Sequence, residues 1–395
     1  MIQRQIGSRI QQLFKRYPVV TITGPRQSGK TTLVRALFGE RPYFNLERLE
    51  EREFAVSDPR GFLARAPHGA VIDEIQRAPG LLSEIQVLVD EHRRNELFVL
   101  TGSQHFHLLD AVTQSLAGRT ALFRLLPFSL AELVQAGLVL PALDELVFTG
   151  LYPRVHDERL PPAEAYADYV ETYVERDLRQ LAQVGDLLLF RHFMRLCAGR
   201  AGQLLNLSGI AAEIGVTLPT VRRWLSLLVA SDVVFLLEPF HANISKRLVR
   251  TPKLYFHDTG LACALLGVLS PAHLAVHPQR GNLYENLALA ETLKHCCNRH
   301  QRTQLAFYRD KTGHEIDLMY PAGHRVAAIE IKSGATVCAD FFHGFAAVDK
   351  ALGTTVARRA LVYPGPQRDT RQGARIIGPE NLDELLTELD ALAQP

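Results

Sequence analysis

Eight consecutive residues near the start of the chain, GPRQSGKT at positions 24 to 31, constrain its fold more than any other feature. They match the pattern G-x-x-x-x-G-K-[ST] and directly follow an apolar run at 19–22. A strand that leads into a glycine-rich turn and then a helix lets backbone N–H groups surround phosphate oxygens at the positive end of the helix dipole. We therefore predict a strand, a phosphate-binding loop and a helix, in this order, in an α/β domain with a parallel sheet.

The loop predicts a role for each polar group that it carries. Lys30 would reach the β- and γ-phosphates of a nucleoside triphosphate, and the Thr31 hydroxyl would ligate Mg²⁺. The predicted nucleotide-binding residues are Gly24, Pro25, Arg26, Gln27, Ser28, Gly29, Lys30, Thr31 and Thr32.

A second strand-like segment at 69–72 ends in two adjacent carboxylates, Asp73 and Glu74. In α/β sheets, ligands bind at the carboxyl ends of the strands. Asp73 is suited to hold Mg²⁺ through water, and Glu74 is suited to orient and deprotonate an attacking water. The pair follows the phosphate loop in the order that P-loop ATPases use, which predicts a nucleotide hydrolase.

Two further residues are candidates for the same site. Ser103 follows a third predicted strand at 97–100 and could sense the γ-phosphate, although a small-residue turn is the alternative. Arg119 follows Gly118 and could reach the nucleotide of a neighbouring subunit, although a helix cap is the alternative. His105 and His107 have no acid or cysteine at metal-ligand spacing, so we assign them to the surface or to packing.

Besides the loop, the sequence contains VIDEIQ at 71–76, LTGS at 100–103 and SLAGR at 115–119, followed by LPF at 126–128. Together these segments resemble the AAA-type P-loop ATPases of archaea and bacteria that carry a C-terminal domain of unknown function. The resemblance runs nearly end to end. It implies ATP with Mg²⁺ as the cofactors, a place for Arg119 near the nucleotide, and assembly into a ring or another homo-oligomer. The base-reading motif N-K-x-D of GTPases is absent from the sequence.

The middle of the chain has the pattern of a winged helix-turn-helix. A predicted helix at 207–214, a turn at 215–217 and a second helix from 218 precede two predicted strands at 233–237 and 254–256. A basic helix beside a basic hairpin can contact DNA phosphates, whereas such a domain on an ATPase can instead be a lid or a protein contact. The candidate DNA contacts are Arg222 and Arg223 on the second helix and Lys246, Arg247 and Arg250 in the hairpin connection.

The last third holds a second group of acids. Glu285 lies in a predicted helix at 283–293, Asp317 in a predicted strand at 315–320, and Glu330 and Lys332 two apart at the end of a strand at 326–332. This arrangement resembles the PD-(D/E)XK nuclease superfamily, in which the carboxylates Asp317 and Glu330 would hold Mg²⁺ and Lys332 would position a water. Glu285 could complete the site from its helix. Many members of this superfamily only bind, so the sequence leaves cleavage open.

Length and composition fit several domains of a globular protein. The 395 residues are 47% hydrophobic and carry a net charge of +2, so any nucleic-acid site depends on local clusters of charge. We expect an AAA-type P-loop ATPase domain at 1–145, a helical lid or connector at 146–200, a winged helix-turn-helix at 201–262 and a nuclease-like α/β domain at 263–395. Five cysteines without C-x-x-C spacing, no signal peptide and no membrane-length apolar run predict a reduced cytoplasmic setting.

The leading hypothesis is a Mg²⁺-dependent ATPase whose nucleotide state is coupled to DNA binding or processing. The alternative is an ATP-driven signalling switch whose C-terminal domains bind protein and do not cleave DNA. A transcriptional regulator is a weaker alternative, because it leaves the three acids and Lys332 without a role.

Overall fold

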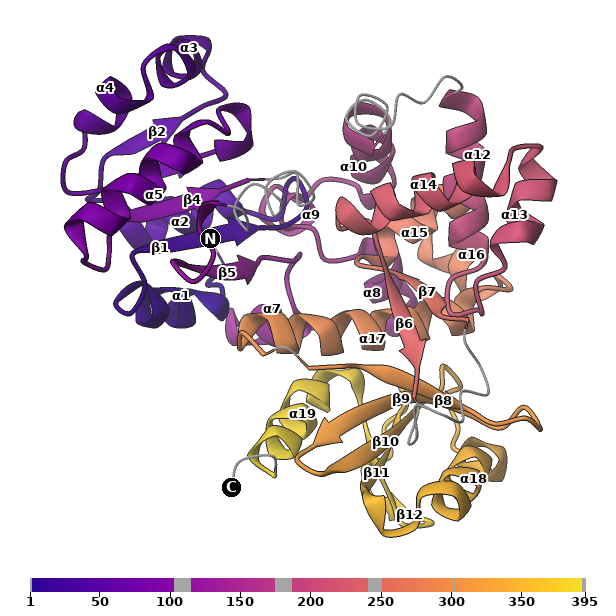
Figure 1. Cartoon of the computed structure of the whole chain (residues 1–395). Helices are drawn as coiled ribbons and strands as arrows, with labels where there is room; N and C mark the ends of the chain where they lie inside the picture. The colour runs from indigo at the N-terminus through magenta and orange to yellow at the C-terminus, as the bar shows by residue number, and fades with distance from the viewer. Residues whose placement is uncertain (1, 103–114, 175–186, 241–250, 302, 393–395) are drawn as a thin grey trace. The chain divides into compact units, whose positions relative to one another are not determined.

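The computed structural model describes residues 2–102, 115–174, 187–240, 251–301 and 303–392 (Figure 1). The chain divides into two compact units. The first comprises Met1–Phe128, Ala230–Asp232 and Cys297–Gln301, and the second comprises Ser129–Val229, Val233–Cys296 and Arg302–Pro395. The domain limits expected from the sequence at 145, 200 and 262 stay predictions.

The first unit contains a parallel sheet of five strands in the order β2-β3-β4-β1-β5. The strands are β1 (Val19–Thr23), β2 (Tyr43–Asn45), β3 (Ala70–Asp73), β4 (Phe98–Thr101) and β5 (Thr120–Arg124). Because β4 lies between β1 and β3, the segments that follow these three strands meet at one edge of the sheet.

Helices cover both faces of this sheet (Figure 1). They are α1 (Ile6–Phe14), α2 (Lys30–Phe38), α3 (Leu49–Ser57), α4 (Pro59–Ala64) and α5 (Leu81–His92), with a 3₁₀ turn η1 (Ile75–Arg77). Successive strand residues point to opposite faces, so Val71 and Val99 pack with α1 and α2, whereas Ile72 and Leu100 pack with α3, α4 and α5. Strands buried on both faces are expected to be almost wholly apolar, which explains why the sequence shows them as continuous runs.

The second unit begins with helices and includes the predicted helix-turn-helix pair. Its first helices are α7 (Leu130–Gln135), α8 (Leu143–Thr149), α9 (Pro153–Asp157), α10 (Pro162–Tyr169), the π-helix η2 (Val170–Val174), α12 (Leu187–Gly199), α13 (Leu207–Ile214) and α14 (Leu218–Ala230). The Asn206 side chain caps α13 by accepting from the Gly209 N–H, and Gly215 at φ 80° ends it. The Thr217 hydroxyl accepts from the Thr220 N–H at 3.3 Å, as predicted for the start of α14.

The remaining elements of the second unit form an eight-stranded mixed sheet with flanking helices. The strand order is β12-β13-β11-β10-β9-β8-β6-β7. The strands are β6 (Val234–Pro239), β7 (Lys253–Phe256), β8 (Ala306–Arg309), β9 (Glu315–Ala322), β10 (Arg325–Ile331), β11 (Val356–Val362), β12 (Thr370–Arg371) and β13 (Ala374–Ile377). The helices are α15 (Thr259–Leu266), α16 (Pro271–Ala275), α17 (Arg280–Asn298), α18 (His343–Leu352) and α19 (Leu382–Ala391), with 3₁₀ turns η4 (Ala339–Phe342), η5 (Gly353–Thr355) and η6 (Pro379–Asn381).

The predicted hairpin is present, but it is not a separate element. β6 pairs antiparallel with β7 and parallel with β8, so the hairpin extends the sheet that contains the C-terminal strands. The pairing of Glu238 with Ala306 lies far outside any local sequence pattern, and for this reason the sequence indicated a free wing.

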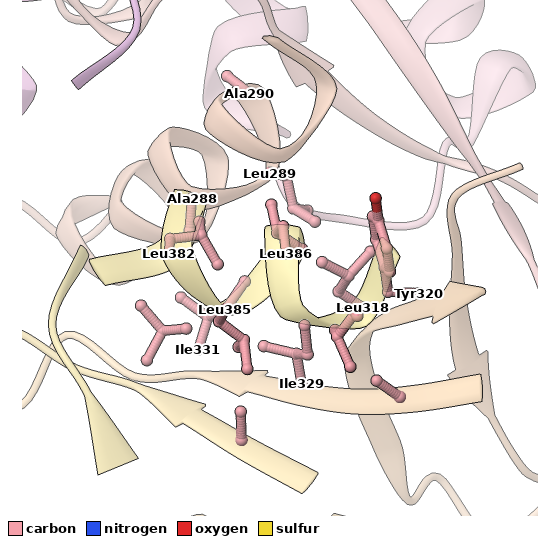
Figure 2. Packing of buried hydrophobic residues seen from close by; sticks show 14 of the residues in the cluster. Ala288, Leu289, Ala290, Leu318, Tyr320, Ile329, Ile331, Leu382, Leu385 and Leu386 are labelled. Carbon is pink, nitrogen blue, oxygen red and sulfur yellow. The ribbon is translucent and has the colours of Figure 1, made fainter. Parts of the chain in front are cut away.

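One of the apolar clusters of this unit packs the sheet against two helices (Figure 2). Leu318 and Tyr320 of β9 and Ile329 and Ile331 of β10 lie in one cluster with residues of α17 and α19. The residues contributed by these helices include Ala288, Leu289, Leu382, Leu385 and Leu386. This packing fixes α17, and hence Glu285, relative to the strands that carry the other acids.

Within the described ranges, every helix is too short or too polar to span a membrane.

Candidate functional site

The phosphate loop is a tight backbone turn between β1 and α2. Gly24, Gln27 and Gly29 have φ values of 144°, 60° and 90°. A Cβ on Gly24 would lie 2.1 Å from the carbonyl oxygen of Leu125, so a side chain at this position clashes with the backbone. Turns that alternate right- and left-handed residues create anion-binding concavities, and α2 begins at Lys30 directly after this one.

Lys30 is buried and folds back over the loop. Its Nζ donates to the carbonyl oxygens of Gly24 at 2.9 Å and Pro25 at 2.8 Å. Burial lowers the pKa of Lys30 to about 8, although the charge of Glu74 opposes this effect. The ammonium therefore has backbone partners that an anionic ligand can replace.

Asp73, at the end of β3, is the centre of the hydrogen bonds at this edge. The Thr31 hydroxyl donates to Asp73 Oδ2 at 2.7 Å, and the Tyr43 hydroxyl donates to the same oxygen at 2.5 Å. The Thr101 hydroxyl at the end of β4 donates to Asp73 Oδ1. A hydroxyl and a carboxylate in contact are oxygen donors of the type that Mg²⁺ prefers, so these residues fit the ion expected from the sequence.

Glu74 follows with a strained backbone. Its φ of 60° is uncommon for a residue with a side chain, and such strain concentrates at functional sites. Its N–H donates to Thr101 Oγ1 at 3.4 Å, and its carboxylate accepts from Gln76 Nε2. Glu74 thus directly follows Asp73, with Thr101 and Gln76 among its hydrogen-bond partners.

Other predicted loop residues differ in exposure. Ser28 is buried, Arg26 is half-buried, and Gln27, Thr31 and Thr32 are exposed. The Ser28 carbonyl accepts from Arg4 Nη1 at 2.8 Å, and Arg4 Nη2 donates to the Leu126 carbonyl at 2.6 Å. This N-terminal arginine, which the sequence analysis missed, ties the loop to the segment after β5.

Arg119 lies at the opposite edge of the sheet from the loop. It directly precedes β5, whose first residue Thr120 pairs with Val19, the first residue of β1. Its guanidinium binds both carboxylate oxygens of Asp90 on α5, at 2.7 and 2.8 Å. Its role between subunits stays a prediction, and Ser103, His105 and His107 lie outside the described residues.

Tyr43 and Thr101 are further residues of this site that the sequence analysis missed. Their signal was weak, because a tyrosine that opens a short strand and a threonine that ends one are common. Thr101 ends β4, but its contact with Asp73 depends on a strand order that no short sequence pattern encodes.

The second unit brings the predicted nuclease-like residues together. Lys332 Nζ lies 2.5 Å from Glu330 Oε1 and 3.6 Å from Asp317 Oδ2. Asp317 Oδ2 also accepts from the Ile331 N–H at 2.8 Å. Glu285 of α17 joins the group electrostatically, since the Asp317 charge acts on both glutamates.

Lys253, the first residue of β7, is an unexpected member of this group. Its Nζ lies 3.1 Å from Glu285 Oε1 and also pairs with Glu315. Tyr255 donates its hydroxyl to the same Glu285 oxygen at 2.5 Å. The sequence predicted a wing hairpin in this part of the chain, as a candidate DNA contact or a protein contact, and the pairing of β6 with β8 was not foreseen.

Burial and like charges control the protonation of these acids. Burial, followed by the Asp317 charge, raises the pKa of Glu285 to about 7 and that of Glu330 to about 8. Burial opposes the charge on Lys253, but Glu285 and its neighbours outweigh it and hold the Lys253 pKa above its usual range. Within the described ranges, no group of three His, Cys, Asp or Glu side chains has the geometry to hold a metal ion.

The candidate DNA contacts lie only partly within the described residues. Arg222 and Arg223 are exposed on α14, whereas Val221, Trp224 and Leu225 of the same helix are buried. Lys246, Arg247 and Arg250 lie outside the described residues.

The sheet, the loop and the acidic end of β3 define a P-loop ATPase domain. In agreement, residues 16–134 match the family model of the AAA domain. Residues 140–272 match a domain of unknown function (DUF8612), and residues 280–380 match another domain of unknown function (DUF4143). The resemblance to P-loop ATPases with a C-terminal domain of unknown function is thus confirmed at this level.

Two curated relatives resemble the chain over nearly its whole length. The uncharacterized protein Mb2031c of Mycobacterium bovis is 31% identical over 388 residues, which are 98% of this chain and 85% of the relative. The uncharacterized protein Rv2008c of Mycobacterium tuberculosis gives the same values. The chain therefore belongs to the protein family of these two relatives.

Among solved structures, the chain resembles the Walker-type ATPase PABY2304 of Pyrococcus abyssi. The TM-score is 0.43 at 17% identity, over 67% of this chain and 96% of that chain. At so low a TM-score, the likeness does not bear on function.

Proposed function

We propose that this protein hydrolyses ATP with Mg²⁺ at the edge of the sheet where the phosphate loop meets β3. The observation that carries the proposal is the 2.7 Å hydrogen bond between the Thr31 hydroxyl and Asp73. It supports a site in which the loop and the acidic strand act on one triphosphate, because the two groups that would hold the ion are in contact.

Each residue then has a distinct task. Lys30 exchanges its two carbonyl partners for β- and γ-phosphate oxygens. Thr31 and Asp73 hold Mg²⁺, which when bound neutralises charge on the phosphates. Glu74 orients the attacking water and accepts its proton, and Thr101 holds the Asp73 carboxylate in place.

Phosphate release by purified full-length protein tests this proposal. We expect turnover of ATP that stops when Mg²⁺ is chelated, and loss of nucleotide binding or turnover in Lys30→Ala. Lys15→Ala is the matched control, because Lys15 is an exposed lysine of the same unit. Turnover by Lys30→Ala at the wild-type rate would contradict the proposal.

We further propose that the second unit engages DNA in a manner coupled to the nucleotide state. Support comes from α14, which buries its apolar side and exposes Arg222 and Arg223. Arginines on the exposed side of a helix that follows a tight turn can contact phosphates or base edges. The nuclease-like grouping of Asp317, Glu330 and Lys332 supports the same ligand.

Fluorescence anisotropy with duplex and single-stranded DNA at two salt concentrations tests the DNA proposal. We expect binding that weakens steeply with salt, by a slope of about 0.9 per phosphate contact for duplex DNA. Replacing both Arg222 and Arg223 with glutamine should weaken binding and reduce this slope by about two. The control replaces Lys15 and Arg16, two consecutive exposed basic residues of the first unit, with glutamine.

Binding that is absent, or that ignores salt and both arginines, would refute the DNA proposal. It would favour the signalling switch, in which the second unit binds protein. ATP hydrolysis is measured separately, so it can stand while the DNA proposal fails.

A further inference from the structure

Four carboxylates, three on strands of the C-terminal sheet and one on α17, lie close together and are largely buried. We call Glu285, Glu315, Asp317 and Glu330 the acidic cluster. Asp317 and Glu330 are each 6% exposed. Carboxylates in such a site need compensating positive charge, because unpaired buried charges are very costly.

Two lysines supply that charge, and their side chains differ in exposure to solvent. The Lys332 side chain is 31% exposed, and Lys332 belongs to the Glu-x-Lys pattern itself. The Lys253 side chain is 5% exposed and pairs with Glu285 and Glu315. Lys332 can turn toward solvent without breaking the fold, whereas Lys253 has no such route.

Strand pairing delivers Lys253 to the acids from a different part of the chain. β6 pairs with both β7 and β8, and β8 pairs with β9, the strand of Glu315 and Asp317. Lys253 Nζ also lies 5.4 Å from the centre of the Phe307 ring of β8, a distance at which a cation is attracted to an aromatic face. The lysine is thus held in place by the sheet itself.

The partners of Lys253 leave little room for a second cation. Glu285 Oε1 accepts from both Lys253 and Tyr255, and Asp317 Oδ2 accepts from the Ile331 N–H. A divalent ion at the Glu285 oxygen would lie beside the Lys253 ammonium, whose charge also interacts with Asp317. Two like charges repel strongly in a buried site. Among the described residues, the buried oxygen Glu330 Oε2 has no hydrogen-bond partner, which marks the point where a cation could still add a contact.

We propose that the Lys253 ammonium is the built-in cation of the acidic cluster and keeps divalent ions out. Asp317 and Glu330 bind a divalent ion when Lys253 is removed, so the nuclease-like site is closed to metal in the wild-type chain. This inference rests on the nuclease-like arrangement proposed above but does not depend on DNA binding.

Manganese binding to the full-length protein without nucleotide tests the proposal. Free Mn²⁺ is measured by electron paramagnetic resonance for the wild type, Asp317→Asn, Lys253→Met and the double variant Lys253→Met/Asp317→Asn. The P-loop residues are unchanged in all four proteins, so any weak binding there is common to them. Lys311→Met is the matched control, because Lys311 is an exposed lysine next to β9.

We expect the wild type and Asp317→Asn to bind Mn²⁺ alike, because the cluster takes up no ion in either. Lys253→Met should gain one site that is at least about tenfold tighter than any in the wild type, because removing the ammonium leaves carboxylates that a divalent ion can neutralise. The double variant should lose the new site, and Lys311→Met should behave as the wild type.

Two outcomes would overturn the proposal. One is a wild-type Mn²⁺ site that Asp317→Asn abolishes, which can be seen even if Lys253→Met does not fold. The other is a Lys253→Met protein with a wild-type circular dichroism spectrum and no added site. Neither outcome bears on the salt-dependent DNA binding, so the two proposals fail separately.

Discussion

Replacing Lys30 with methionine should abolish nucleotide binding and at the same time remove a pH-dependent cost to the stability of the ATPase unit. Lys30 is 6% exposed, and burial lowers its pKa from 10.5 to about 8. This pKa difference corresponds to about 3 kcal/mol. The free energy of unfolding is lower by this amount at any pH where Lys30 is charged in both the folded and the unfolded protein. The cost is a consequence of keeping a buried cation in the loop for a phosphate ligand.

The sign of the pH dependence follows from the lowered pKa. Below pH 8 the lysine is charged in the folded and the unfolded protein, so the full cost is present. As the pH rises from 8 toward 10.5, the folded protein releases its proton first and the cost disappears. Relative to Lys30→Met, the wild type should therefore gain about 2 kcal/mol of unfolding free energy between pH 7 and pH 9.5.

Differential scanning calorimetry of the full chain can measure this gain. The transition of the ATPase unit is identified by its rise in the wild type when ATP and Mg²⁺ are added, because a ligand stabilises the state that binds it. Lys15→Met removes the same charge from an exposed position and should show no such pH dependence relative to the wild type. A constant difference between wild type and Lys30→Met across this pH range would refute the claim that burial penalises the Lys30 charge.

Three further predictions address the same unit. Glu74→Gln should bind ATP as the wild type does but release phosphate about 10²–10⁴ times more slowly. A loss of ATP affinity as large as the loss of turnover, measured by nucleotide titration, would contradict the role of Glu74 as the base. Arg4→Met removes the 2.8 Å hydrogen bond to Ser28 and should lower the unfolding free energy by about 2–4 kcal/mol and weaken nucleotide binding, so unchanged values of both would show that Arg4 does not support the loop. Arg119→Ala should lose activity alone and regain part of it when mixed with Lys30→Ala, since a mixed assembly pairs an intact loop with an intact arginine; no regain would exclude action between subunits.

The local parts of the ATPase site could be predicted from the sequence, because they depend on consecutive residues. The glycines at 24 and 29 adopt the positive φ values that the motif requires, and Lys30 opens the helix. The meeting of Thr31 with Asp73 could also be predicted, since both follow strands of one parallel sheet.

Contacts that depend on strand order and on distant pairing could not be predicted. Thr101 and Tyr43 reach Asp73 because β4 and β2 flank β3, and the sequence does not encode that order in any short pattern. Arg4 contacts Ser28 of the loop, 24 positions away, and Leu126, 122 positions away, and no local pattern predicts either contact. Lys253 follows the basic hairpin connection in sequence, whereas its neighbours in space are the acids Glu285 and Glu315, so no local pattern predicts its place in the acidic group.

The position of β6 in the sheet determines whether the second unit can be divided into separately folding fragments. This strand belongs to the region matched at 140–272, and β8 belongs to the region matched at 280–380, yet the two share one ladder of backbone hydrogen bonds. Cutting the chain between these regions would leave an unpaired strand edge on each fragment, and such edges promote aggregation. The two domains of unknown function therefore form one folding module here, and they are best expressed and studied together.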